Sequence, residues 1–129
     1  MGANDKIGVA IQGAGTVSSG HLRAYLRNPN VEVVAIGSRS KDGAAAKARE
    51  VGIDPSKISL YDSVDDLAAD PRIDAVSITS PNHRHPGDAI TLASGGKHIL
   101  VEKPIAMNPE ELAAMDAAVS KAGVKSVCG

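Results

Sequence analysis

Short apolar runs alternate with segments of helical character along the whole chain, and this alternation is the feature that most limits its fold. The runs are rich in Val and Ile, which favour strands, and the segments between them have the length of crossover helices. Such alternation predicts a parallel sheet covered by helices on both faces. We therefore expect a doubly wound α/β domain with a mainly parallel sheet of six strands in the order 3-2-1-4-5-6. The runs are residues 6–11, 31–36, 58–61, 73–78, 98–101 and 124–128.

The first apolar run leads into a glycine-rich turn, Gly13-x-Gly15-x-x-Ser18. The first glycine permits a tight turn, the second lets the backbone approach a pyrophosphate, and the helix that starts near Thr16 and Val17 offers free N–H groups. These are the parts of the dinucleotide-binding fingerprint of a Rossmann fold. Ser18 replaces the third glycine, which we expect to widen the packing of helix on sheet slightly without preventing binding. Glycine-rich turns of this kind also occur without a ligand, so both interpretations remain open.

The second apolar run ends at the segment 37–41, GSRSK, about where a bound dinucleotide would place its ribose. A site for NAD would want an acid here to accept a hydrogen bond from the 2′-hydroxyl. The segment instead offers Ser38, Arg39, Ser40 and a lysine, which suit the additional phosphate of NADP because arginine grips phosphate with a fork of N–H donors. We therefore expect NADP, with NAD possible. A solvated loop whose arginine points to water is the alternative.

The overall charge and composition argue against nucleic acid and membranes as partners. The formal net charge is -1, so no basic field of the whole domain would hold a polyanion. Tyr25 and Tyr61 are the only Phe, Trp or Tyr residues, too few for a stacking platform. No apolar stretch is long enough for a signal peptide or a membrane span, and the single Cys128 is most simply a buried thiol in a reducing compartment. We therefore expect a cytoplasmic protein.

Two other nucleotide-binding classes fit the sequence poorly. A Walker-type phosphate loop would need Lys and Ser or Thr where His21 and Leu22 stand. A methyltransferase that uses S-adenosylmethionine would usually want an acid after the second run for the ribose hydroxyls, and that segment has none. Neither His21 nor His98 has an evident chemical partner, so we expect both to be packing or surface histidines.

Two polar clusters follow the fourth and fifth runs, where ligands of open α/β sheets bind. They are residues 79–85, TSPNHRH, and residues 102–104, EKP. With the glycine-rich turn and His21, the motifs Ser80-Pro81-Asn82-x-x-His85 and Glu102-Lys103-Pro104 resemble the N-terminal domain of the Gfo/Idh/MocA oxidoreductases, the family of glucose-fructose oxidoreductase and inositol 2-dehydrogenase. The resemblance extends over essentially the whole of residues 1–129, which we expect to be one dinucleotide-binding Rossmann domain.

The resemblance implies an NAD(P)-dependent dehydrogenase that moves hydride to or from a sugar-like or cyclic polyol substrate. Lys103 would hold the reacting oxygen and assist proton transfer, and His85 would face the substrate, so these two are the catalytic candidates. The loop after the fourth run would contact the nicotinamide half, and Glu102 would flank its pocket. The candidate cofactor-binding residues are Gly13, Gly15, Thr16, Val17, Ser38, Arg39, Ser40, Thr79, Ser80, Pro81, Asn82, Glu102 and Lys103.

The family also implies a C-terminal substrate-binding domain, which residues 1–129 do not include. We therefore expect the isolated domain to bind cofactor without turnover, and the full-length form to be a homo-oligomer. A non-catalytic redox sensor that binds the dinucleotide is the alternative function. Lys103 argues against a sensor, since a pure sensor needs no cation at the position of hydride transfer.

Several of these residues also have simpler interpretations. Asn82 or His85 could cap the helix expected to start near Pro86, and capping need not exclude contact with a ligand. Lys103 could be an exposed turn residue, because a residue before proline is extended in any loop. His83 and His85 have no second cluster with ligand spacing beside them, so we expect no metal site.

Overall fold

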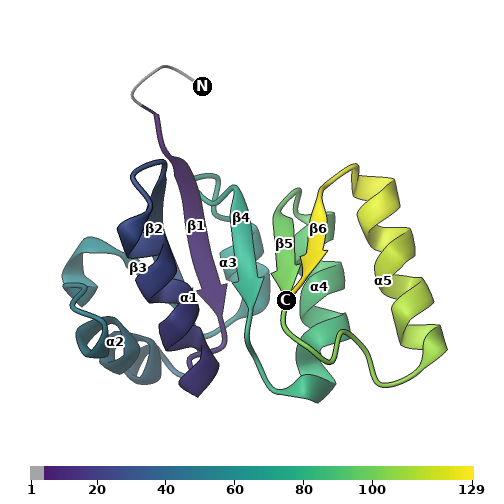
Figure 1. Cartoon of the computed structure of the whole chain (residues 1–129), viewed down its shortest axis with the longest axis horizontal. Helices are drawn as coiled ribbons and strands as arrows, with labels where there is room; N and C mark the ends of the chain where they lie inside the picture. The colour runs from purple at the N-terminus through teal and green to yellow at the C-terminus, as the bar shows by residue number, and fades with distance from the viewer. Residues whose placement is uncertain (1–4) are drawn as a thin grey trace.

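The structure is a computed structural model that describes residues 5–129, so residues 1–4 of the expected domain lie outside the described part. Within it, six strands form one sheet in the order β3-β2-β1-β4-β5-β6, and every adjacent pair is parallel (Figure 1). The predicted doubly wound fold and its strand order are confirmed. The strands are β1 (Ile7–Gln12), β2 (Val31–Gly37), β3 (Ser59–Tyr61), β4 (Ala75–Ile78), β5 (His98–Val101) and β6 (Ser126–Cys128). The helices are α1 (Thr16–Arg27), α2 (Lys41–Glu50), α3 (Val64–Ala68), α4 (His85–Ser94) and α5 (Pro109–Ala122), with the 3-10 turns η1 (Pro55–Lys57) and η2 (Asn82–Arg84).

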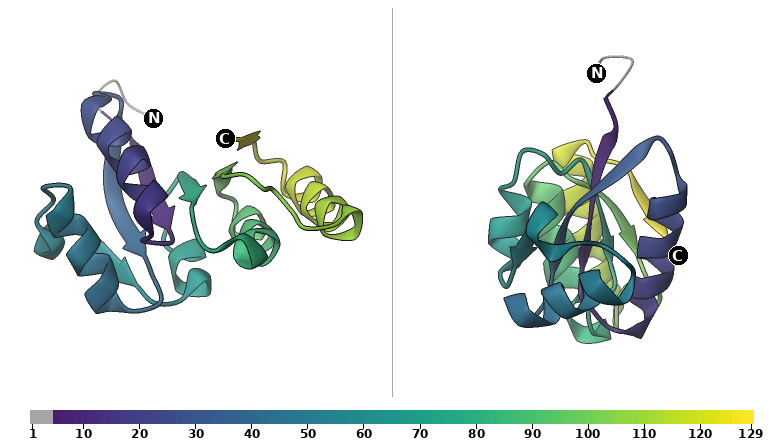
Figure 2. Two further views of the ribbon diagram at one scale, coloured as in Figure 1. Left: turned by 60° about the horizontal axis from the view of Figure 1, so that its bottom comes forward. Right: turned by 90° about the vertical axis from the view of Figure 1, so that its left-hand side faces the viewer.

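Two apolar layers hold the helices against the sheet, one on each face. Successive strand residues point to opposite faces, so Ala10 and Ala35 enter one layer while Ile11 and Ile36 enter the other. The layer with Ile11 contains side chains of α1 and α2, and the layer with Ala10 contains side chains of α3, α4 and α5. Figure 2 shows helices on both sides of the sheet. The carboxyl ends of the strands therefore meet at one edge, at the bottom of Figure 1.

The ends of several helices follow the local signals in the sequence. Asn108 caps α5 by accepting from the Glu111 N–H at 2.9 Å, and Gly123 ends that helix with φ 70°. Ser63 caps α3 through the Asp66 N–H, as its spacing predicts. Ser40 caps α2, which therefore begins at Lys41. The turns η1 and η2 were not predicted.

The prediction that Cys128 is buried is wrong. Cys128 lies in β6, which pairs with β5 on one side only and whose three residues are all exposed. Strand side chains point to the two faces of the sheet, and those of β6 are left uncovered there, which a burial estimate from residue type alone does not include. No helix within residues 5–129 is long and apolar enough to cross a membrane.

Candidate functional site

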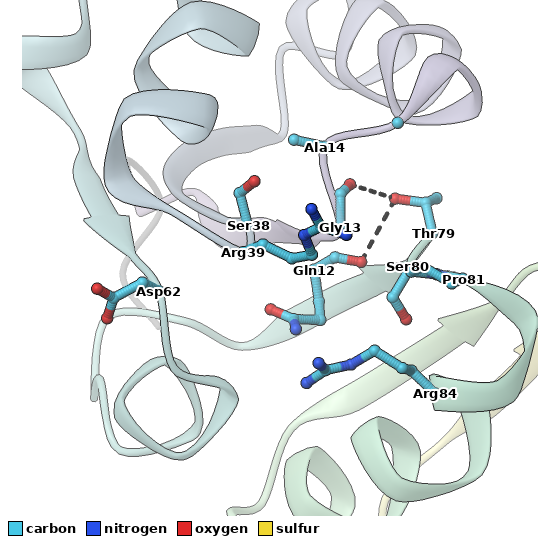
Figure 3. Close-up of a pocket in the computed structure, with 11 residues that line it drawn as sticks. Gln12, Gly13, Ala14, Ser38, Arg39, Asp62, Thr79, Ser80, Pro81 and Arg84 are labelled. Atoms are coloured by element: carbon cyan, nitrogen blue, oxygen red, sulfur yellow. Dashed lines mark hydrogen bonds between the residues drawn. The ribbon is translucent and has the colours of Figure 1, made fainter.

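A cleft of about 360 Å³ opens at the carboxyl edge of the sheet, where β1, β2, β3 and β4 end (Figure 3). The strand order reverses between β1 and β4, and ligands of doubly wound sheets bind at such a point. The cleft collects residues predicted from the sequence together with others that were not. The predicted lining residues are Gly13, Gly15, Ser38, Arg39, Thr79, Ser80 and Pro81, and the additional ones are Gln12, Ala14, Asp62 and Arg84.

The glycine-rich turn is anchored from both neighbouring strands. The Gly13 N–H donates to the Gly37 carbonyl at 2.9 Å. The Thr79 hydroxyl donates to the Gly13 carbonyl at 2.7 Å, as the dashed line in Figure 3 shows. Gly13 has φ +105°, and a Cβ built on it would lie 2.4 Å from the Ser80 nitrogen. The backbones are thus too close for any residue but glycine at this position.

Gly15 is required by neither the backbone nor the packing. Its φ is -76°, and a Cβ built on it would meet no atom within 4 Å. Thr16 and Val17 follow it as exposed residues at the start of α1, whose first turn carries no acidic side chain. Open space beside free helical N–H groups suits a phosphate. Ser18 is fully buried and its hydroxyl donates to the Gly15 carbonyl at 2.5 Å, so the replaced glycine position is filled and hydrogen-bonded.

The segment after β2 brings a cation and a hydroxyl to the cleft. Ser38 and Arg39 line it, and Arg39 points into it in Figure 3. Ser40 does not line it, because its hydroxyl accepts from the Gly43 N–H at 3.0 Å as the cap of α2. Asp62, directly after β3, lies at the outer side of the same cleft. An acid therefore does reach this region, from the third strand and not from the second.

A buried carboxylate, Asp88 of α4, contacts three side chains that line the cleft. It accepts from the Ser80 hydroxyl at 2.7 Å and from Gln12 Nε2 at 3.5 Å. Arg84 Nη2 lies 3.7 Å from its other oxygen, and the Arg84 side chain extends into the cleft in Figure 3. Gln12 ends β1, so its place could have been inferred from the sequence. Arg84 ends η2 and Asp88 lies in the first turn of α4, and the sequence pattern did not predict that either would contact this site.

His85 joins the loops that follow β4 and β5. It is buried, its Nε2 lies 2.7 Å from the Ser80 carbonyl oxygen, and its Nδ1 lies 2.7 Å from the Pro104 carbonyl oxygen. The suggested capping role is wrong, because α4 follows Arg84 without a side-chain cap and Asn82 is an exposed residue of η2. A contact between His85 and substrate stays a proposal.

Lys103 is exposed and lies outside the lining of the cleft. Its N–H donates to Glu102 Oε2 at 3.2 Å, while Glu102 Oε1 lies 2.8 Å from His21 Nε2. This hydrogen bond from His21 is the main reason that the pKa of Glu102 lies below its ordinary value. A charged carboxylate therefore stands beside the backbone of Lys103. Residues 5–129 contain no group of three His, Cys, Asp or Glu residues that could hold a metal ion.

Comparison with known proteins gives a consistent picture. The sequence pattern of the Gfo/Idh/MocA group, an oxidoreductase family with an NAD-binding Rossmann fold, matches residues 7–129. An uncharacterised oxidoreductase of Rhizobium meliloti is 49% identical over 91 residues, which are 70% of this chain and 26% of that protein. The scyllo-inositol 2-dehydrogenase (NAD(+)) of Bacillus subtilis (strain 168) is 34% identical over 116 residues, 89% of this chain and 33% of that protein.

Both cofactors occur in the names of relatives. A second scyllo-inositol 2-dehydrogenase of the same organism, named for NADP(+), is 31% identical over 115 residues, 89% of this chain and 34% of that protein. A solved structure of a putative myo-inositol dehydrogenase from Sinorhizobium meliloti 1021 has a TM-score of 0.84 at 28% identity, over 96% of this chain and 36% of that one. This chain spans about a quarter to a third of the length of the curated relatives it matches. With the predicted motifs, the fold and the family pattern in agreement, the chain belongs to the Gfo/Idh/MocA oxidoreductases and is their NAD-binding Rossmann domain.

Proposed function

We propose that this domain binds NADP in preference to NAD and serves a dehydrogenase of a sugar-like or cyclic polyol hydroxyl, or of the matching ketone. The observation that carries the cofactor preference is the lining of the cleft, where Ser38, Arg39 and Arg84 face the space beside the glycine-rich turn and Asp62 lies at its outer side. Arginine recognises phosphate with a planar fork of N–H donors, and Arg39 with the Ser38 hydroxyl beside it would suit an additional phosphate. The substrate class is supported by relatives named as inositol dehydrogenases.

The residues present fit a dinucleotide. The cofactor's pyrophosphate would lie over Gly15, where a Cβ would meet no protein atom, against the N–H groups at the start of α1. Ser38 and Arg39 would hold the ribose phosphate. Ser80 and Pro81, which line the cleft, would reach the nicotinamide half together with Asn82. When bound, a nicotinamide cofactor supplies the hydride chemistry.

The protein's own chemistry would centre on Lys103. In the reduction of a ketone, its ammonium would lie against the substrate oxygen, stabilise the negative charge that develops there, and donate a proton from Nζ. In the oxidation of a hydroxyl, the neutral amine would accept that proton at Nζ. Glu102, whose carboxylate stays charged, keeps a negative group beside the Lys103 backbone. The exposed position of Lys103 suits a group that must meet a substrate arriving from outside this domain.

We infer that the substrate is oriented by a second domain beyond these residues. The greater length of the relatives supports this, and so do the exposed apolar side chains of Leu112 in α5 and Val127 in the edge strand β6. The homo-oligomer and the cytoplasmic location expected from the sequence belong to this proposal.

Calorimetric titration of the domain tests the cofactor preference. NADPH should bind at least tenfold more tightly than NADH, a difference of about 1.4 kcal/mol. A parallel titration of Gly15→Val should show at least a hundredfold weaker binding of both cofactors, which would locate the heat signal at the cleft. Equal affinities for the two cofactors would contradict the NADP preference, and absence of binding in the wild type would contradict the cofactor site.

A further inference from the structure

A chain of hydrogen bonds links α1, the helix that starts at the glycine-rich turn, to the segment that carries Lys103. The Tyr25 hydroxyl is bonded to the Ser77 hydroxyl in β4. Ser77 Oγ lies 3.0 Å from His21 Nδ1, and His21 Nε2 lies 2.8 Å from Glu102 Oε1. The remaining carboxylate oxygen, Glu102 Oε2, accepts from the Lys103 N–H at 3.2 Å. His21 is thus neither a surface nor a simple packing histidine, and the corresponding expectation from the sequence is wrong.

One placement of protons satisfies this chain with a neutral imidazole. The Glu102 carboxylate only accepts, so His21 carries its proton on Nε2 and donates it. Nδ1 then accepts from the Ser77 hydroxyl, which in turn accepts from Tyr25. Ser77 is fully buried and the His21 side chain is 15% exposed, so water competes little for these bonds. The orientation of the Glu102 carboxylate is therefore fixed from α1 and β4.

Lys103 is held through its neighbours on both sides. On one side stands Glu102, bonded to His21 of α1. On the other side the Pro104 carbonyl oxygen lies 2.7 Å from Nδ1 of His85, which starts α4. The Lys103 side chain itself is exposed. Two histidines from two helices thus fix the backbone from which this side chain leaves the sheet.

We propose that His21 is a positioning residue for Lys103: it holds the Glu102 carboxylate, which in turn fixes the backbone N–H of Lys103. This inference rests on the proposed function, because the action of Lys103 on a substrate oxygen is part of that proposal. Proton transfer and charge stabilisation depend steeply on geometry, so a small displacement of the Lys103 backbone lowers the rate of the chemical step. A packing role would require only the shape of the ring, whereas a positioning role requires the donor at Nε2.

The test compares two substitutions of His21 that differ in the donor. His21→Phe keeps a ring without nitrogen, and His21→Gln keeps an amide N–H that can reach Glu102. In isotope-labelled protein of residues 1–129, NMR follows the Lys103 amide resonance as the Glu102 carboxyl titrates. We expect a titration midpoint below that of an ordinary glutamate in the wild type, a shift upward in His21→Phe, and recovery of at least half of that shift in His21→Gln.

Two further variants keep the test decisive. Ser77→Ala removes the hydroxyl that contacts His21 Nδ1 and changes the side-chain volume little. It therefore replaces His21→Phe if that variant does not fold. The Glu102 titration midpoint should move upward in Ser77→Ala by a smaller amount than in His21→Phe. His98→Phe is the matched control, since His98 is an exposed residue at the start of β5 whose Nδ1 accepts from the Lys125 N–H. It should leave the midpoint of Glu102 unchanged. Wild-type midpoints in both His21→Phe and Ser77→Ala would overturn the positioning role.

Cofactor binding and turnover separate this inference from the proposed function. The Kd for NADPH should change less than twofold in His21→Phe, because His21 does not line the cleft. In a chain extended through the substrate domain, kcat should fall about tenfold in His21→Phe with an unchanged KM for NADPH, and His21→Gln should return it to within threefold of the wild type. Failure of the wild type to bind NADPH would overturn the proposed function, whereas wild-type kcat in folded His21→Phe would overturn the positioning role alone.

Discussion

The glycine-rich turn after β1 and the Lys103 segment after β5 leave the same edge of the sheet, but they end in different surroundings. Around the turn, four strand ends enclose a cleft of about 360 Å³, and the backbone of Gly13 is bonded from both sides. Lys103 is exposed, whereas its neighbours Glu102 and Pro104 are each in hydrogen-bond contact with a helix histidine, His21 and His85. In the proposed function, this domain binds the nicotinamide cofactor, whereas the chemistry at Lys103 would also need residues of a second domain around the substrate.

The largest expected effect is a loss of turnover without a loss of cofactor binding. In a chain extended through the substrate domain, Lys103→Met should lower kcat at least a hundredfold, because the substrate oxygen loses its cation and its proton partner. The Kd for NADPH should stay within about threefold, since Lys103 lies outside the cleft. The assay is a screen of sugars and cyclic polyols with absorbance at the reduced-nicotinamide band. Near wild-type activity would refute the role of Lys103.

The isolated chain of residues 1–129 is the natural control for that experiment. It should bind NADPH and turn nothing over, because holding the reacting carbon against the nicotinamide contributes several kcal/mol to a rate and would, in the proposed function, depend on groups of a second domain. Robust turnover by residues 1–129 alone would show that Lys103 acts without a second domain. The contrast between the glycine-rich turn and the Lys103 segment would then disappear.

The second prediction is a loss of cofactor binding without a loss of stability. Gly15→Val should weaken both NADPH and NADH at least a hundredfold, about 2.7 kcal/mol, because its side chain fills the space for the pyrophosphate. Its stability should change by less than about 1 kcal/mol, since its φ of -76° suits any residue and a Cβ meets no atom within 4 Å. Calorimetry and urea unfolding measure the two effects separately.

Gly13→Ala is the matched comparison within the same turn. A Cβ there would lie 2.4 Å from the Ser80 nitrogen at φ +105°, so the variant should lose about 2 to 4 kcal/mol of stability. Normal NADPH binding by Gly15→Val would show that the cofactor does not use the space beside Gly15. Wild-type stability of Gly13→Ala would show that the fold does not require glycine at position 13.

The residues that sequence reasoning found share one property, which is that they directly follow an apolar run. Ser38, Arg39 and Thr79 could be predicted because the carboxyl ends of parallel strands meet at one edge. Asp62 also follows such a run and could have been found by the same rule. The dinucleotide fingerprint places its ribose-binding acid after the second strand, so that pattern does not predict Asp62.

Other parts of the site depend on tertiary geometry that no local pattern contains. Asp88 lies beneath Ser80 only because η2 turns the chain before α4 begins. His21 meets Glu102 across 81 positions of sequence, and their pairing follows from the register of β4 between β1 and β5. Local signals therefore predicted the elements and the edge, while the hydrogen-bonded contacts between elements required the fold.

The third prediction sharpens the comparison by changing which cofactor the cleft prefers. Ser38→Asp combined with Arg39→Gln should invert the order, so that NADH binds at least tenfold more tightly than NADPH. The new acid accepts from a 2′-hydroxyl and repels a 2′-phosphate. Lys121→Gln is the control, because Lys121 lies in the last turn of α5 outside the cleft and should leave the preference unchanged. Calorimetry with both cofactors measures the ratio, and an unaltered ratio would move the phosphate site elsewhere.

The smallest expected effect concerns Asp70, which does not line the cleft. Its substitution tests whether the stability of the fold can change without a change in cofactor binding. Arg72 donates to its carboxylate through Nε at 3.1 Å and Nη2 at 2.6 Å, and Tyr61 Oη donates at 2.7 Å. The hydrogen bonds from the Arg72 side chain are the main reason that the pKa of Asp70 lies well below its ordinary value. A carboxyl with a lowered pKa stabilises the fold above the pKa of the unfolded chain, about 3.9, and this contribution is lost as the pH falls toward the folded value.

Asp70→Asn should therefore unfold at a lower urea concentration than the wild type at pH 7, and the gap should narrow at pH 3, where the wild-type carboxyl begins to lose its advantage. The Kd for NADPH at pH 7 should remain within twofold, because Asp70 does not line the cleft. Asp116→Asn, at an exposed position of α5, is the control and should show no such convergence. A gap that stays constant from pH 7 to pH 3 would mean that the charge of Asp70 contributes nothing to the fold. A parallel loss of NADPH affinity would mean that the contacts of Asp70 affect cofactor binding in the cleft.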